Sequence, residues 1–181
     1  MAKAFLIMMI SLVFCIQTET NAADSTLIDF KIKDQFKILR TNTDIEDKVL
    51  IIIGSNKAGN KFNKIWEKEL RDSLKNTDYY ERILSFGVPD FRGVPFFIKG
   101  SIRRKLAKDS TNNILMDWKG KFVKAYEYVE GKSNILIFDT DGQLRSKTAV
   151  TEMEYTELNK ILQLIKNICS SDVAIRKKDN P

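Results

Sequence analysis

The hydrophobic pattern of the chain centres on one short run. Residues 49–53 are all large aliphatic residues, which is typical of a strand buried on both faces of a sheet. Gly54 ends the run, and a polar loop at residues 55–60 follows. The next apolar residues recur at helical spacing: Phe62, Ile65, Trp66, Leu70 and Leu74. The pattern predicts a buried strand, a tight loop and a helix that packs on a sheet.

Segments on either side of this unit supply more strands and a second helix. Residues 27–32 and 36–39 predict an N-terminal β-hairpin, and residues 82–86 predict a strand. Pro95 suits the first turn of a helix that runs to about residue 108. We expect this helix to bury one apolar stripe, which consists of Ile98, Ile102 and Leu106.

Two later segments share one pattern. Residues 114–122 and 135–144 each carry an apolar strand, an Asp, a two-residue gap, a Gly and a return. Asp141-Gly142 is a strong signal for a tight turn. The second copy therefore predicts a β-hairpin that returns through residues 145–150.

The last predicted element is a helix. Thr151 and Glu154 have the spacing of a capping box, and one apolar face follows: Leu158, Ile161, Leu162, Ile165 and Ile168. Residues 171–181 are polar and are expected to form a disordered tail, which leaves residues 23–170 as one domain. The element order predicts an α/β fold with a central mixed sheet flanked by helices, right-handed crossovers and an N-terminal β-hairpin extension.

The N-terminal residues have the pattern of a targeting segment. Lys3 precedes an apolar run at residues 4–16, which is short for a membrane span. Small residues at Thr20 and Ala22 favour cleavage of a signal peptide formed by residues 1–22, so a periplasmic or secreted chain without a stable membrane span is expected. An uncleaved anchor is one alternative. Lipidation of Cys15 is another, although bulky Phe14 disfavours it.

Composition restricts the chemistry. The 181 residues are 43% hydrophobic and 30% charged, which is an ordinary globular balance. The net charge of +6 is spread along the chain without a nucleic-acid-binding motif. There are no histidines, which excludes Ser-His, Cys-His and His-metal sites. The only cysteines are Cys15 and Cys169, so no Cys-x-x-Cys pair exists, and neither a metal nor a cofactor is expected.

A resemblance adds to this picture. The segment Asp117-Trp118-Lys119-Gly120 through Tyr126, followed by residues 135–144, resembles the second half of redoxins and peroxiredoxins. The chain is also similar to the YtfJ-like family of periplasmic proteins, which pair a signal peptide with an Ile-x-Gly loop lacking redox cysteines. The Gly-x-x-Phe stretch at residues 93–98 is part of that likeness, which covers roughly residues 27–168. The resemblance implies a thioredoxin-like fold and an envelope location, but no settled activity.

The departures from redox-active relatives bear on mechanism. Their nucleophilic cysteine sits in the loop after the first core strand, where this chain has residues 56–60 and no thiol. They also place a cis-proline before the hairpin strand, where this chain has Ser133. The resemblance therefore implies that both halves of a redox site are missing.

Other motifs have structural interpretations that we favour. Residues 138–142 resemble the first motif of haloacid-dehalogenase phosphatases, but too little chain follows to supply the rest of that site. Asp117, Asp139 and Asp141 fit turn capping better than a metal site. In the loop at residues 88–97 we expect the aromatic side chains of Phe91, Phe96 and Phe97 to be buried; if exposed, they would mark a partner site.

These observations favour a non-catalytic thioredoxin-fold protein that binds an envelope protein or a small anionic ligand. The alternative is a redoxin-type thiol oxidoreductase or peroxidase that uses Cys169 or an unrecognised site. In redox relatives the loop after the first core strand meets the turn before the hairpin strand, so the resemblance implies that residues 55–60 lie beside residues 132–134. Both segments would sit at the carboxyl end of the core strands, where open α/β sheets bind ligands. The expected polar cleft consists of Ser55, Asn56, Lys57, Asn60 and Ser133.

Overall fold

The computed structural model describes residues 26–109 and 112–179, so the expected signal peptide and Cys15 lie outside the described residues. A five-stranded mixed sheet forms the centre, in the order β5-β4-β3-β6-β7. Its strands are β3 (Val49–Gly54), β4 (Ile83–Gly87), β5 (Asn113–Ile114), β6 (Ser133–Phe138) and β7 (Leu144–Val150). β4 runs parallel to both β3 and β5, whereas β6 runs antiparallel to β3 and β7.

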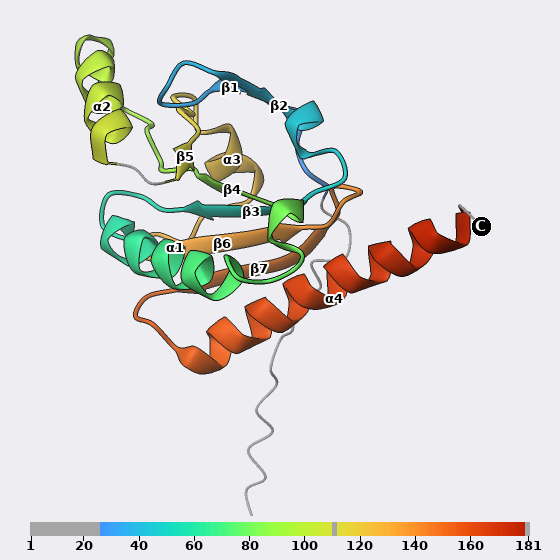
Figure 1. Ribbon diagram of the computed structural model, residues 1–181. Helices are drawn as coiled ribbons and strands as arrows, with labels where there is room; N and C mark the ends of the chain where they lie inside the picture. Colours follow the sequence, from blue (N-terminus) through green and yellow to red (C-terminus); the bar gives the residue numbers. More distant parts are fainter. Residues whose placement is uncertain (1–25, 110–111, 180–181) are drawn as a thin grey trace, which may run out of the picture.

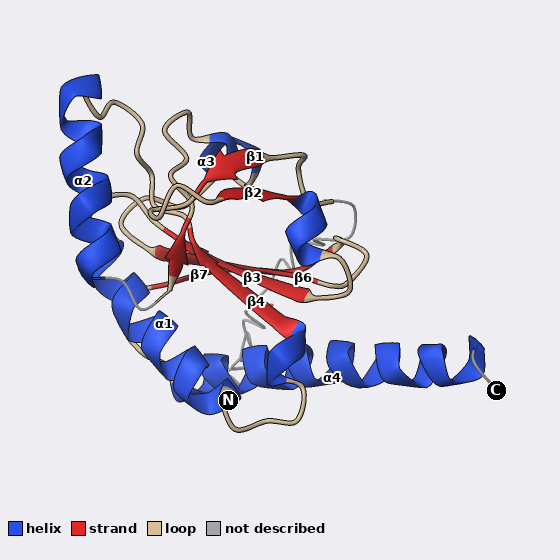
Figure 2. Ribbon diagram, turned by 45° about the horizontal axis from the view of Figure 1, so that its top comes forward, coloured by secondary structure: helices blue, strands red, loops and turns tan. Residues whose placement is uncertain are grey.

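Helices and a hairpin cover the two faces of this sheet (Figures 1 and 2). α1 (Asn60–Leu74) and α4 (Tyr155–Asp179) lie on one face. The other face carries the hairpin of β1 (Lys31–Lys33) and β2 (Leu39–Thr41), the short helix η1 (Asn42–Ile45) and α3 (Lys121–Ala125). The second short helix, η2 (Tyr80–Arg82), precedes β4, and α2 (Phe96–Asp109) stands beyond the β5 edge.

The central strand β3 behaves as its sequence predicts. All six of its residues are buried. Leu50 and Ile52 point into the core beneath the hairpin and α3, while Val49, Ile51 and Ile53 face α1 and α4. Strict alternation of side chains along a strand divides the aliphatic run between two cores, which is why no polar residue interrupts it.

The hairpin of β6 and β7 is also confirmed. Gly142 adopts φ +74°, a conformation that glycine reaches without steric cost. The carboxylate of Asp139 accepts hydrogen bonds from the backbone N–H groups of Asp141 at 3.0 Å and Gln143 at 2.8 Å. It also pairs with Arg145. In the motif that resembles that of phosphatases, the Asp139 carboxylate therefore caps the turn.

The first copy of the strand-Asp-Gly pattern differs from the prediction. Its strand, β5, has only two residues, and α3 replaces the expected return strand. Gly120 adopts φ +64° and turns the chain, and Asp117 Oδ2 accepts a hydrogen bond from the N–H of Phe122 at 3.0 Å. A carboxylate that satisfies an N–H in the first turn favours a helix over a strand.

The expected burial of the second helix is wrong in its first turn. Phe91 is buried, but Phe96 and Phe97 are 84% and 74% exposed, and Ile98 is 38% exposed. Only Ile102 and Leu106 reach a small satellite cluster, with Phe91, Ile114 and Met116. Because β5 is so short, the sheet provides little surface for this helix to cover.

Three boundaries also differ. The first hairpin pairs residues 31–33 with 39–41, a few residues later than the pattern indicates. α4 begins at Tyr155, four residues after Thr151, and it continues to Asp179 where the sequence predicts a tail. Its buried face is the predicted one, with Leu158, Ile161 and Ile165 in the core. Within the described residues, no helix is long and apolar enough to cross a membrane.

Candidate functional site

Two loops meet at the carboxyl end of β3, as the sequence predicts. Asn56 Oδ1 accepts hydrogen bonds from the N–H of Gly59 and from the N–H of Gly131, each at 3.1 Å. Asn134 Nδ2 lies 3.3 Å from the carbonyl oxygen of Gly54, which adds a second link between the segments. Residues 55–60 therefore lie beside residues 131–134, and we call this contact the loop junction.

The loop junction is packed rather than open. A Cβ atom at Gly59 would lie 2.3 Å from the carbonyl oxygen of Lys132, which only glycine avoids. Ser55 and Ser133 are 1% and 0% exposed, and Ser133 Oγ has no hydrogen-bond partner among the described residues. Both hydroxyls thus lie in the interior, while Lys57 and Asn60 are exposed.

Tyr128 closes the junction from the other side. A Cβ at Gly54 would lie 2.4 Å from the Tyr128 ring and 2.3 Å from the carbonyl oxygen of Val88, so Gly54 gives both groups room. Tyr128 is partly buried, and its hydroxyl oxygen is buried without a hydrogen-bond partner among the described residues. Burial, with a smaller effect of nearby Asp117, raises its pKa far above the usual value. Tyr128 therefore stays neutral and acts as a packing residue.

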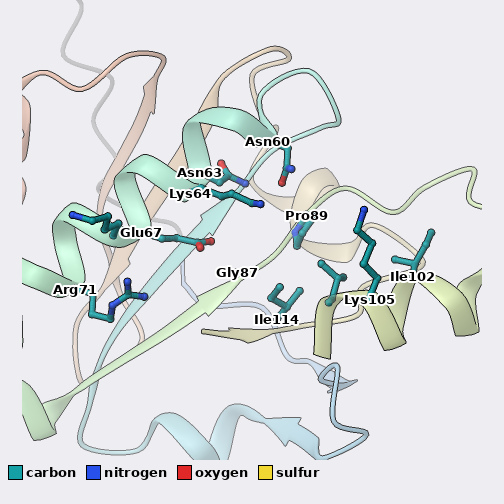
Figure 3. Close-up of a pocket in the computed structure, with 12 residues that line it drawn as sticks. Asn60, Asn63, Lys64, Glu67, Arg71, Gly87, Pro89, Ile102, Lys105 and Ile114 are labelled. Atoms are coloured by element: carbon teal, nitrogen blue, oxygen red, sulfur yellow. The ribbon is translucent and has the colours of Figure 1, made fainter. Parts of the chain in front are cut away.

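An open cavity lies next to this junction, between α1, the end of β4, β5 and α2 (Figure 3). Its volume is about 400 Å³, within the range of small-molecule sites. Asn60, in the first turn of α1, belongs both to the expected cleft and to the cavity wall. The other lining residues are Asn63, Lys64, Glu67, Lys68, Arg71, Gly87, Pro89, Ile102, Lys105, Leu106 and Ile114.

The cavity has a basic rim and an apolar floor. α1 contributes Lys64, Lys68 and Arg71, and α2 contributes Lys105 from the opposite side. Lys68 already pairs with Asp72 at 3.1 Å, and Arg71 Nη1 donates to Asn112 Oδ1 at 3.3 Å. Lys64 and Lys105 are exposed lysines on opposite walls. The floor is apolar and consists of Pro89, Ile102, Leu106 and Ile114.

Glu67 is the one acidic residue of the lining. Burial raises its pKa to about 7, against smaller opposing effects of a hydrogen bond with Asn112 and the charges of Arg71 and Lys64. Gly87 leaves space for this carboxyl group, since a Cβ there would lie 3.3 Å from Glu67 Oε1. A carboxyl group in such a position exchanges its proton near neutral pH.

Asn63 connects the cavity to the loop junction. Its Nδ2 donates a hydrogen bond to Ser55 Oγ at 2.9 Å, and the residue is 3% exposed. Its Oδ1 has no hydrogen-bond partner among the described residues. A buried acceptor without a partner costs free energy.

The polar part of this lining consists of four cationic residues, Glu67 and two asparagines. Among the described residues, the lining contains no cysteine, serine or threonine that could attack a substrate. Cys169 is 2% exposed and lies in the apolar core beneath α4, together with residues such as Ile161 and Ile165. No group of three or more potential metal-ligating side chains occurs in the described part of the chain.

Sequence reasoning anticipated the loop junction and missed the cavity. Glu67 and Lys64 look like solvent-facing positions on an amphipathic helix, and nothing local indicates that α2 stands opposite them. The one available signal was Gly87 at the end of a strand, since glycine in a strand often marks a close approach.

No protein-family model and no curated protein matches the sequence. Solved structures do match. An exposed lipoprotein thioredoxin from Streptococcus pneumoniae has a TM-score of 0.58 at 17% identity, covering 77% of this chain and 99% of its own. A putative thiol:disulfide interchange protein DsbE from Chlorobium tepidum has a TM-score of 0.57 at 15% identity, covering 80% and 95%.

The chain has a thioredoxin-like fold. A third match supports this: the bacterioferritin comigratory protein of Xanthomonas campestris, with its alkyl peroxide reduction activity, has a TM-score of 0.56. It is 10% identical and covers 77% of this chain and 92% of its own. Identities this low establish the thioredoxin-like fold alone. The function has to be argued from the side chains that this chain carries.

Proposed function

We propose that this chain is an exported, non-catalytic binding protein of the cell envelope, and that it holds a small anionic ligand in the cavity beside α1. One observation carries the proposal: four cationic side chains and one acid of raised pKa surround a cavity of about 400 Å³. Once Glu67 takes up a proton, the lining has no negative charge and attracts an anion from two sides.

The shape of the cavity narrows the ligand class. Lys64 and Lys105 stand on opposite walls, while Ile102 and Leu106 form part of an apolar floor. A ligand with one acidic group and a short apolar portion satisfies both surfaces. An envelope protein that presents such an acidic group has the same chemistry.

Only part of the expected cleft belongs to the proposed site. That cleft consisted of Ser55, Asn56, Lys57, Asn60 and Ser133. Asn56 holds the loops together, and the two serines are buried. Lys57 and Asn60 remain exposed, and Asn60 also lines the cavity. We assign Lys57 a role in attracting the anion and Asn60 a role in the wall of the site.

The envelope location rests on the N-terminal pattern and on the resemblance to YtfJ-like proteins. An apolar run followed by Thr20 and Ala22 fits a cleaved signal peptide. Mass spectrometry of the protein recovered from an envelope fraction tests this, and a mature N-terminus at or near Ala23 is expected. Recovery of intact residues 1–15 would contradict it.

Binding is tested by titrating the protein with acetate, hexanoate and inorganic phosphate, followed by two-dimensional NMR. Hexanoate should bind more tightly than acetate because its chain covers the apolar floor. Binding should be tighter at pH 6 than at pH 8, because protonation of Glu67 near pH 7 removes a repulsive charge.

Lys64→Gln with Lys105→Gln should weaken hexanoate binding at least tenfold. The control pair is Lys61→Gln with Lys108→Gln, one exposed lysine from each of the same helices and neither in the cavity lining. Equal losses in the two pairs, or no saturable shifts at residues 60–71, would reject the cavity as the site.

The redoxin alternative has its own test. Its only described thiol, Cys169, is 2% exposed and faces the apolar core between α4 and the sheet, where a substrate does not reach it. We expect no thiol peroxidase or disulfide reductase turnover. Robust turnover that Cys169→Ser abolishes would replace the binding proposal with the enzymatic one.

A further inference from the structure

The first turn of α2 presents an exposed aromatic pair. Phe96 and Phe97 are 84% and 74% exposed. Their rings pack edge to face, with ring centroids 6.1 Å apart. Ile98 beside them is 38% exposed. The two ribbon views agree that α2 stands at the outer side of the molecule, beyond the β5 edge of the sheet (Figures 1 and 2).

The two rings are exposed although the inner side of α2 is packed against the rest of the protein. Ile102 and Leu106 already use the inner side of α2 by packing against the cluster of Phe91, Ile114 and Met116. At about 100° per residue, Phe97 lies roughly on the opposite side of the helix from these two residues. The outer side therefore carries large apolar groups that no described part of the chain covers.

The same outer side is basic. α2 contains five Lys or Arg residues and one Asp in its sequence. Ser101, Arg104 and Lys108 follow Phe97 at helical spacing and are exposed, and Arg104 donates a hydrogen bond to Ser101 Oγ at 3.2 Å. Arg104 and Lys108 therefore continue a stripe along the helix that begins at Phe97.

We propose that this stripe docks the protein on an anionic lipid bilayer, with Phe96 and Phe97 inserted at the interface. A bilayer accepts a protruding pair of rings without a matching groove, and apolar groups of interfacial helices sink about 5–10 Å below its surface. Arg104 lies seven residues after Phe97, about 10 Å along the helix axis. When α2 tilts into the bilayer with its N-terminal end foremost, this rise brings the Arg104 guanidinium group near the level of the lipid phosphates.

The charge distribution favours a membrane over an apolar protein groove. The attraction between Arg104, Lys108 and anionic headgroups needs no fixed geometry, since long basic side chains adjust to a fluid surface. The positive end of the helix dipole also lies at the inserted end of α2. The site is independent of the ligand cavity, so either can fail without the other.

A tryptophan placed at the proposed insertion point reads out docking at α2 itself. The full chain carrying Phe96→Trp is mixed with vesicles of phosphatidylglycerol and phosphatidylcholine at 1:3, and with vesicles of phosphatidylcholine alone. A blue shift relative to wild type, with quenching by brominated acyl chains, is expected with the anionic vesicles. Tyr155→Trp, at an exposed position on α4, is the matched control and should not shift.

Two paired variants separate the apolar and the electrostatic contributions in a vesicle sedimentation assay. Phe96→Ser with Phe97→Ser should reduce the anionic-lipid-dependent binding at least tenfold, whereas Phe36→Ser with Leu39→Ser, exposed residues of the N-terminal hairpin, should not. Arg104→Glu with Lys108→Glu should reduce it similarly. The control pair with the same charge change is Lys160→Glu with Lys166→Glu on α4.

Two results would overturn the proposal. One is an emission spectrum of the Phe96→Trp variant that is the same with and without anionic vesicles. The other is a concentration-dependent dimer in the absence of lipid that Phe96→Ser with Phe97→Ser abolishes, since this would assign the aromatic pair to contact between two copies of the chain.

Discussion

Asn63 Nδ2 donates a hydrogen bond to Ser55 Oγ across 2.9 Å, joining the first turn of α1 to the residue that follows β3. Both side chains are buried, at 3% and 1% exposure. This contact connects the cavity beside α1 to the loop junction. It also distinguishes two buried serines that the sequence treats alike.

Ser55→Ala should destabilise the protein by about 1–3 kcal/mol, because it leaves the buried Asn63 amide without its partner. Ser133→Ala is the matched control. Its hydroxyl is equally buried but has no hydrogen-bond partner among the described residues, so its loss should be nearly neutral. Urea unfolding followed by circular dichroism measures both. A larger cost for Ser133→Ala than for Ser55→Ala would contradict the assignment.

Glu67 should make the stability of the protein fall as the pH rises from about 4.5 to about 7. In that interval the unfolded chain has lost the proton that folded Glu67 retains, so ionisation favours unfolding. Above about pH 7 both states are ionised and the loss is complete. A pKa difference of one corresponds to about 1.4 kcal/mol, so the rise from 4.5 to about 7 corresponds to a full loss on the order of 3 kcal/mol.

Glu67→Gln should remove this part of the pH slope and raise stability at pH 8, because the amide fills the same space without a charge. Glu69→Gln, two residues away and paired with Lys68 at 3.4 Å on the surface, is the control. Chemical denaturation at pH 5 and pH 8 gives the slope. An unchanged slope in Glu67→Gln would show that Glu67 is ionised in the folded protein at pH 5.

Gly59→Ala should destabilise the protein by about 1–3 kcal/mol, the usual cost of forcing extra atoms into a packed region. The new methyl group would lie 2.3 Å from the Lys132 carbonyl oxygen, and backbone cannot rotate away as a side chain can. Gly100→Ala, in the middle of α2 with nothing within 4 Å of the new Cβ, should instead stabilise by about 0.5–1 kcal/mol. Thermal unfolding of the two variants in parallel checks the contrast.

Tyr126→Phe and Tyr128→Phe should have opposite consequences. Tyr126 accepts a hydrogen bond from the N–H of Ile28 at 2.8 Å and donates one to the carbonyl oxygen of Thr26 at 3.1 Å. Removing its hydroxyl should cost about 1–2 kcal/mol. The Tyr128 hydroxyl makes no such bond among the described residues, and its removal should be neutral or stabilising. Equal costs in urea unfolding would refute the distinction.

Much of the fold could be predicted because its signals are local. The aliphatic run of β3 and the Asp141-Gly142 turn each determine their structure within a few residues. The loop junction was expected from the resemblance to redox relatives, in which the two corresponding loops meet. α2 shows the limit: the spacing of Ile98, Ile102 and Leu106 indicates a helix face but not how much sheet lies beneath it.

The cavity could not be predicted for a related reason. The raised pKa of Glu67 depends on burial between α1 and β4, which are separated in sequence by a loop and a short helix. Nothing in the residues around Glu67 distinguishes it from Glu69, whose carboxylate faces solvent beside Lys68. The environment of a charged side chain depends on tertiary structure, whereas the sequence pattern describes only the helix on which the residue lies.

The close approach of Gly59 to the Lys132 carbonyl also restricts how this chain can change. A cysteine, or any other side chain, at position 59 would begin with the same collision that alanine meets. Thiol chemistry at that point of the loop would first require a shift of residues 131–134, which Asn56 and Asn134 tie in place. For an engineer who wants a reductase on this scaffold, the starting point is the backbone of that second loop rather than the missing sulfur.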